Sequence, residues 1–210
     1  MKVTTMDRND LTQYYWKHYL LLEKKVLKTS RYVEIDYDNF KSFSSEYLML
    51  IEAIGAELDH FFKIYCDLET DSRSSIQDYA NSILVSYPDI VNQKIFVLET
   101  DISLTPFQGW NLQQPSQSLL CWNNYINLKH NRSGYFKEAN LFNTLNILSA
   151  LCLLEMKEFM NIWDNTPNNQ GIPNSPSTGS KLFLLENWNS NWIEAGKIEG
   201  IILGSSNNNP

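Results

Sequence analysis

The sequence predicts a mainly α-helical protein, a bundle of four to five helices with a small β-hairpin insertion and an extended C-terminal segment. Apolar residues recur three and four positions apart over several long stretches, which is the spacing of one helix face. Apolar residues make up 43% of the 210 positions, enough for a packed core. One internal stretch, 94–104, instead has two short apolar runs around a polar turn, which is typical of a hairpin.

Three helices are predicted before the hairpin. The first spans 10–28 and ends in a lysine-rich turn, where cations suit the helix dipole. The second spans 36–69 and carries the longest periodic pattern in the chain. The third spans 74–86 and is ended by Pro88, since proline cannot continue a helix.

The long second helix has two informative features. Its apolar row begins with Phe40 and Phe43 and continues through Tyr47 at helical spacing. Gly55 interrupts it, and a glycine within a helix costs about 1 kcal/mol relative to alanine. Close packing against another helix is the expected reason for a glycine at this position.

Two further helices are predicted after the hairpin. One is capped by Ser116 or Ser118 and ends near Arg132. The other spans 135–163 and is apolar almost all round, so it should be the central helix of the bundle. Its first half carries asparagines three residues apart, and this edge should face solvent or a polar pocket: Asn140, Asn143 and Asn146.

The domain organisation follows from these patterns. Residues 1–164 form one helical domain that contains the hairpin. Residues 165–180 are rich in Pro, Asn, Ser and Gly, and this composition predicts a flexible linker. Residues 181–210 form a C-terminal appendage with two short strands, at 181–188 and 197–203.

Composition narrows the classes of partner and site. The net charge of -7 argues against general binding to duplex DNA but leaves a local RNA or nucleotide site open. The three cysteines are widely spaced and form no Cys-x-x-Cys pair, so we expect free thiols in a reducing, cytoplasmic setting. No metal site and no cofactor are predicted, because familiar ligand and phosphate-binding motifs are missing. No apolar run is long enough to predict a membrane span.

The candidate catalytic residues are Lys129, His130 and Arg132. A histidine titrates near neutral pH and can transfer a proton. Arginine and lysine can stabilise the charge on a phosphate, so this set suits metal-independent cleavage of a phosphodiester. The alternative is structural, because the end of a helix favours Lys, His and Arg through its dipole and free carbonyls. That alternative is preferred for Lys129 alone, while both readings stay open for His130 with Arg132.

Five further residues are candidates for binding. Asn127, Asn131 and Asn140 offer amide donors and acceptors near the basic cluster. Asp59 and Lys63 are four apart on the long helix, the spacing of an ordinary surface ion pair. Alternatively, a carboxylate on this face of the long helix orients His130 or Arg132 across the bundle.

A resemblance adds to this reading. It is carried by a long helix followed by an aromatic turn, a basic helix end and an asparagine-rich helix: Glu57-Leu-Asp-His-Phe-Phe-Lys63, Pro106-Phe-x-x-Trp110, Trp122-x-x-Tyr125-x-x-x-Lys129-His130-x-Arg132 and Ala139-Asn140-Leu141. Over roughly 40–160 the chain resembles uncharacterised bacterial helical proteins and, more distantly, the HEPN superfamily of helical-bundle ribonucleases and nucleotide-binding domains.

The resemblance implies a helical bundle, a homodimer whose basic motifs meet at the interface, and metal-independent RNA cleavage in stress response or phage defence. The family's catalytic signature places an arginine shortly before a histidine, whereas here Arg132 follows His130. Two functions therefore remain open. The first is an RNA-binding protein or metal-independent endoribonuclease, and the second is a non-catalytic interaction or regulatory module in a larger assembly.

Overall fold

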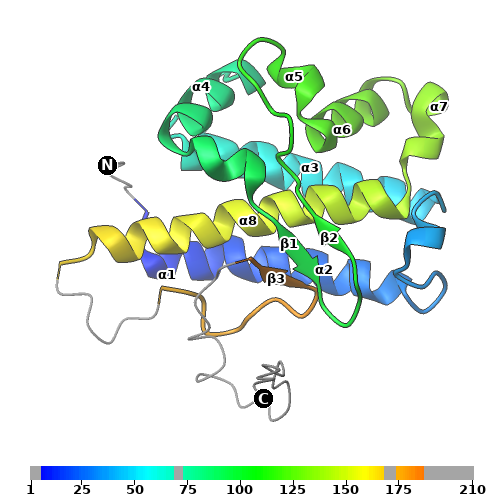
Figure 1. Ribbon diagram of the computed structural model, residues 1–210, viewed down its shortest axis with the longest axis horizontal. Coiled ribbons are helices and arrows are strands. Elements are labelled where there is room, and N and C mark those ends of the chain that lie inside the picture. The colour runs from blue at the N-terminus through cyan, green and yellow to red at the C-terminus, as the bar shows by residue number, and fades with distance from the viewer. Residues whose placement is uncertain (1–5, 69–72, 168–173, 187–210) are drawn as a thin grey trace, which may run out of the picture.

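The computed structural model describes residues 6–68, 73–167 and 174–186, and it confirms a mainly α-helical fold with a small antiparallel sheet (Figure 1). Three long helices run alongside one another: α2 (Lys17–Thr29), α3 (Ser45–Tyr65) and α8 (Leu141–Asn165). No helix in the described ranges is both long and apolar enough to cross a lipid bilayer.

Helix α8 is central, as its nearly uniform apolar composition predicts. It packs against both α2 and α3, and its side chains from Leu145 to Met156 are almost all buried. It begins at Leu141 rather than at 135, because the Asn140 side chain caps it by accepting a hydrogen bond from the Asn143 N–H at 2.9 Å. A 3-10 turn, Phe136–Glu138, fills the preceding positions.

Helix α3 is shorter than the predicted 36–69. It begins at Ser45, where the Ser44 side chain accepts a hydrogen bond from the Tyr47 N–H at 3.1 Å. The residues before it form a 3-10 turn, Tyr37–Asn39, and an extended stretch in which Phe43 bridges to Asn140. The periodic apolar row thus continues past the true start of the helix.

The remaining helices are shorter. The first predicted helix is found as α1 (Arg8–Asp10), a π-helical stretch (Leu11–Trp16) and α2 in direct succession. Helix α4 (Ile76–Ser86) ends just before Pro88, as predicted.

The predicted helix ending near Arg132 is divided into three pieces: α5 (Pro115–Ser118), α6 (Leu120–His130) and α7 (Arg132–Tyr135). Neither Ser116 nor Ser118 caps a helix here. The Ser118 hydroxyl instead accepts a hydrogen bond from the backbone N–H of Asn111 at 3.1 Å, which holds the loop before α5.

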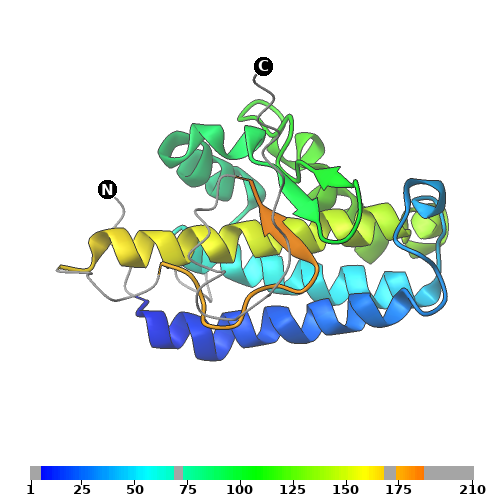
Figure 2. The same ribbon diagram turned by 60° about the horizontal axis from the view of Figure 1, so that its bottom comes forward.

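The hairpin predicted at 94–104 is present as β1 (Ile95–Val97) and β2 (Ser103–Leu104). A third strand from the C-terminal segment, β3 (Phe183–Leu185), pairs with the other edge of β1, so the order is β2-β1-β3 (Figure 2). The strand predicted at 197–203 lies outside the described residues.

The described end of the predicted linker, 174–180, is anchored rather than free. The Arg8 guanidinium donates to the Ser175 carbonyl at 2.6 Å, and the Trp16 indole N–H donates to the Thr178 carbonyl at 2.7 Å. The hydroxyl oxygens of Tyr19 and Ser180 lie 3.0 Å apart. The expectation of a flexible linker is therefore wrong for this part, because long-range contacts with α1 and α2 outweigh its turn-forming composition.

Gly55 has the packing reason expected of it. A Cβ at this position would lie less than 3.0 Å from three atoms of the Tyr125 ring on α6. Gly55→Ala should therefore lower the free energy of unfolding by about 1 kcal/mol, since an overpacking cost of roughly 1–3 kcal/mol exceeds the helix-propensity gain of about 1 kcal/mol. In a Tyr125→Ala background the same substitution should stabilise the protein, because only the propensity gain remains.

Urea unfolding of wild type, the two single variants and the double variant checks whether the effect of Gly55→Ala on stability changes sign. Ala56→Gly is the matched control on the exposed neighbouring position and should lose about 1 kcal/mol in both backgrounds. An effect of Gly55→Ala that is equal with and without the Tyr125 ring contradicts the prediction.

Candidate functional site

The basic cluster lies at the junction of α6 and α7. Lys129 and His130 form the last turn of α6, and Asn131 breaks the helix with a φ of -142° and a ψ of 65°. The Asn131 side chain accepts a hydrogen bond from the Gly134 N–H at 3.2 Å and so caps α7. Asn131 therefore has a structural role in this turn. Asn127, one turn earlier, donates its amide to Asn123 at 3.3 Å and is only partly buried.

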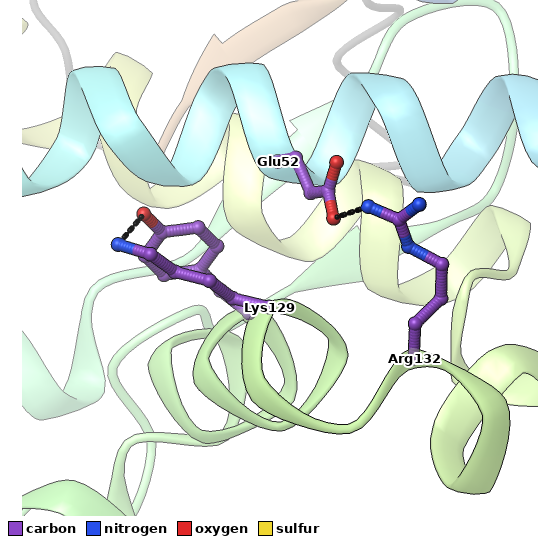
Figure 3. Close-up of polar contacts among 4 residues, drawn as sticks. Glu52, Lys129 and Arg132 are labelled. Carbon is purple, nitrogen blue, oxygen red and sulfur yellow. Dashed lines mark hydrogen bonds and ion pairs between the residues drawn. The ribbon is translucent and has the colours of Figure 1, made fainter.

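Lys129 is held by Tyr125. Its ammonium group donates to the tyrosine hydroxyl at 3.3 Å and lies 5.4 Å from the centre of the ring (Figure 3). A cation over an aromatic face is attracted by the ring quadrupole, so a local contact explains the position of the side chain. This agrees with the structural reading of Lys129.

Arg132 forms an ion pair across the bundle. Its guanidinium lies 2.9 Å from the carboxylate of Glu52 on α3, and both side chains remain partly exposed (Figure 3). A carboxylate of α3 thus does face the basic cluster, but it is Glu52 and not Asp59. The guanidinium has five N–H donors, so donors remain available for a phosphate.

Asp59 and Lys63 lie elsewhere on α3. The Asp59 carboxylate accepts a hydrogen bond from the Tyr79 hydroxyl on α4 at 2.9 Å. Burial, together with this carboxylate, raises the pKa of Tyr79 and keeps the phenol protonated. Lys63, one turn further along, is partly buried. Asp59 therefore joins α3 to α4, and it does not orient His130 or Arg132.

His130 is exposed, and its imidazole makes no hydrogen bond or ion pair with the described part of the chain. The buried edge expected for the pair of His130 and Arg132 is not found, because both side chains point from the surface of a turn. A histidine that acts as a general base is usually oriented by a partner and reaches into a closed site. The described residues of one chain do not assemble such a site around His130.

The other two histidines have ordinary partners. His18 lies 3.1 Å from the Glu57 carboxylate, and His60 stacks on the ring of Tyr15. Within 6–68, 73–167 and 174–186, no three His, Cys, Asp or Glu side chains are grouped so as to hold a metal ion.

A groove lies where α6, the start of α8 and the stretch before α3 meet. Its volume is about 680 Å³, and we call it the asparagine groove. Aromatic rings, amides and charged side chains line it: Phe40, Lys41, Phe43, Leu120, Asn124, Lys137, Glu138, Asn140, Phe142 and Asn143. Two asparagines of the predicted edge, Asn140 and Asn143, thus line this pocket, whereas Asn146 does not.

Hydrogen bonds hold the amides of the groove in place. Asn143 accepts from the Asn124 amide at 2.8 Å and donates to the Glu138 carbonyl at 2.8 Å and its carboxylate at 3.1 Å. Asn140 donates to the Lys137 carbonyl at 3.1 Å besides capping α8. The side-chain oxygen of Asn124 accepts no hydrogen bond from the described residues and remains available to a ligand.

The charges of the groove come from two lysines and the Glu138 carboxylate rather than from the helix end. The first N–H groups of α8 are already used, since Leu141 donates to the Ser42 carbonyl and Phe142 to the Phe40 carbonyl. They cannot also bind an anion. Lys41 and Lys137 are exposed, and neither has an ion-pair partner among the described residues, so both can meet a negative ligand.

Of the candidate residues, only Asn140 lines the groove. The sequence did not identify the aromatic and lysine side chains that line it. Phe40 and Phe43 fit a helical period and were therefore expected to belong to a helix face. Lys41 and Lys137 stand in turns just before two capped helices, and the cap signals Ser44 and Asn140 could have indicated that both lysines precede a helix.

The chain matches no protein-family model, no curated protein and no solved structure.

Proposed function

We propose that this protein binds single-stranded RNA in the asparagine groove and along the adjoining basic turn. The observation that supports it best is a groove that combines one exposed and two partly buried aromatic rings, oriented amides and two lysines without ion-pair partners among the described residues. Proteins recognise single-stranded RNA by stacking bases on aromatic side chains, by hydrogen bonds to base edges, and by cations along the backbone. The resemblance to the HEPN superfamily supports the same ligand class.

The basic turn can extend the contact. Arg132 and Lys137 are five residues apart, so their Cα atoms are separated by at most about 18 Å. Arg132 keeps donors beyond those that meet Glu52, and it is 61% exposed. Because the protein carries a net charge of -7, we expect a short footprint and an affinity that depends on these few cations.

Binding without cleavage is the form of the proposal that we favour for a single chain, because His130 has no orienting partner in the described residues. Cleavage would need a second group near His130, which a homodimer with facing basic turns would supply. Incubating RNA with the protein in EDTA, with His130→Ala and Arg132→Ala alongside, decides this. Degradation that is lost in both variants supports the ribonuclease, whereas intact RNA supports binding alone.

The groove variants should weaken RNA binding in two different ways. Phe43→Ala removes a ring that is 46% exposed and should weaken binding about tenfold, as expected for one lost stacking contact. The double variant Lys41→Ala/Lys137→Ala should reduce the slope of log affinity against log salt by about 1.4, since each phosphate contact on a single strand contributes about 0.7. Fluorescence anisotropy with a labelled RNA oligomer at several salt concentrations measures both effects.

The matched control is the double variant Lys24→Ala/Lys25→Ala, which removes the same charge from α2. It should change the affinity less than the groove variant does. If the two double variants weaken binding equally, attraction is non-specific and the groove is not the site. If the wild-type protein binds no RNA at low salt, the proposed function is wrong.

A non-catalytic docking role is the second candidate, and it is supported by another cavity. A space of about 610 Å³ between α2 and α3 is lined by Lys25, Lys28, Tyr32, Met49 and neighbouring residues. Tyr32 and Met49 are large apolar side chains that are more than half exposed. Exposed apolar groups around a cavity mark interaction sites. Light scattering of wild type and Met49→Asp would show whether this face joins copies of the chain, and an unchanged monomer mass excludes that partner.

A further inference from the structure

A second, smaller cavity lies next to the asparagine groove. Its volume is about 210 Å³, and its walls come from β2 and the turn after it, from α6 and from α8: Ser103, Leu104, Thr105, Pro106, Gln108, Leu120, Phe142 and Asn146. Leu120 and Phe142 line this cavity and also the groove. The two spaces are therefore neighbours, separated by these two side chains.

Asn146 is the unusual residue of this cavity. It is the third asparagine of the row on α8 and only 4% exposed. The side chains of Asn140 and Asn143 are bonded within the protein, but the Asn146 amide makes no hydrogen bond with any described residue. A primary amide carries two donors and an acceptor, and those of Asn146 keep accessible surface, so they can meet a ligand in the cavity. The position is therefore suited to a ligand that supplies the missing partners.

The rest of the cavity fits a small, neutral, partly polar ligand. The side chains of Ser103, Thr105 and Gln108 make no hydrogen bonds with described residues, and Leu104, Pro106 and Phe142 add apolar walls. None of the residues that line the cavity is charged, so it does not suit a phosphate. Its volume lies below the roughly 300 Å³ at which sites for drug-sized ligands begin, which leaves room for one ring system.

We propose that this cavity binds a single nucleobase, with the Asn146 amide hydrogen-bonded to the edge of the base. The proposal rests on RNA binding in the asparagine groove. An asparagine amide pairs through two hydrogen bonds with a base edge that presents a donor beside an acceptor, and the walls of the cavity decide which base can bring such an edge to Asn146. The backbone then lies in the groove near Lys41 and Lys137, and one base passes Leu120 and Phe142 to reach Asn146.

The test compares base preference in wild type and in Asn146→Leu, which removes the amide and keeps a similar shape. The probes are labelled oligomers of A, C and U and the four nucleoside monophosphates as competitors. We expect wild type to prefer one base, and Asn146→Leu to weaken binding of that oligomer by about tenfold to a hundredfold while binding of the others changes little. Asn81→Leu, on the exposed surface of α4, is the matched control and should keep the preference.

The outcomes separate the base site from the proposed function. If wild type binds RNA, and Asn146→Leu keeps the same affinities and the same preference, the base site is wrong while RNA binding stands. If wild type binds no RNA, the proposed function fails and the base site with it. If circular dichroism shows that Asn146→Leu is unfolded, the base preference of Thr105→Val and of Gln108→Ala, two variants at the rim of the cavity, is measured instead. Loss of base preference in either rim variant supports the site, and full retention in both overturns it.

Discussion

Glu23→Ala is expected to lower the free energy of unfolding by about 3 kcal/mol and to release the C-terminal strand from the sheet. Glu23 lies on α2, is 2% exposed, and receives hydrogen bonds from the 180–182 segment. Its carboxylate accepts from the backbone N–H groups of Lys181 at 3.0 Å and of Leu182 at 3.2 Å. The hydroxyls of Tyr19 and Ser180 also donate to it.

The magnitude follows from the donors that the substitution leaves behind. Each hydrogen bond to a charged group contributes roughly 1.5–3 kcal/mol, and a buried donor without a partner costs about 1–3 kcal/mol. Part of that cost disappears when the segment detaches and its N–H groups reach water. The net loss should therefore stay near 3 kcal/mol rather than equal the sum of the bonds.

Two measurements check this prediction. Urea unfolding gives the loss of stability, and limited proteolysis should cut Glu23→Ala near Lys181 much faster than wild type. Glu34→Ala is the matched control, because it removes an exposed carboxylate. Equal stability and equal protection in Glu23→Ala and Glu34→Ala would show that the carboxylate does not anchor the segment.

The anchor also bears on the candidate site. Strand β3 pairs with β1, and β1 pairs with β2, whose Ser103 and Leu104 form part of the smaller cavity. Glu23 thus supports that wall through two strands. Loss of β3 leaves the other edge of β1 unpaired, so the cavity wall should become less ordered in Glu23→Ala.

Glu155→Met is expected to raise the free energy of unfolding at pH 7 by about 2 kcal/mol. Glu155 lies in the middle of α8 with no exposed surface, and neither carboxyl oxygen has a hydrogen-bond partner among the described residues. A buried polar group without partners costs about 1–3 kcal/mol, and more if it is charged. Methionine has a similar length and adapts to the shape of the core, so it removes this cost.

The effect should depend on pH in a defined direction. Burial, with a smaller contribution from the negative charge of Glu57, raises the pKa of Glu155 well above its usual value. Between the unfolded pKa of about 4.3 and the raised folded pKa, only the folded state holds the proton. The contribution of Glu155 to the free energy of unfolding is therefore most favourable at low pH. It falls by up to about 1.4 kcal/mol per pH unit as the pH rises between these two pKa values.

Thermal or urea unfolding of wild type, Glu155→Gln and Glu155→Met from pH 4 upward measures this slope. The advantage of each variant over wild type should grow with pH and then level off above the folded pKa. Glu34→Gln, at an exposed carboxylate, should show no such growth. A difference between wild type and Glu155→Gln that is the same at every pH contradicts the prediction.

The sequence predicted much of the helical framework because helices are encoded locally. The all-round apolar pattern identified α8 as the central helix, and a single glycine indicated the close approach of Gly55 to another helix. Helix starts were predicted less well. Phe40 and Phe43 fit the helical period, but they line the asparagine groove, and α3 begins only after the Ser44 cap. Periodicity alone does not separate a helix face from a pocket wall that has the same spacing.

The candidate site depended more strongly on tertiary contacts. The sequence identified the basic turn and the asparagine row, because both are patterns within a few neighbouring residues. It could not show that Arg132 meets Glu52, 80 positions away, or that Glu23 binds a segment 158 positions away. Which distant segments meet is decided by how the helices pack. That packing places Asn146 in a cavity lined by β2, and it leaves His130 exposed.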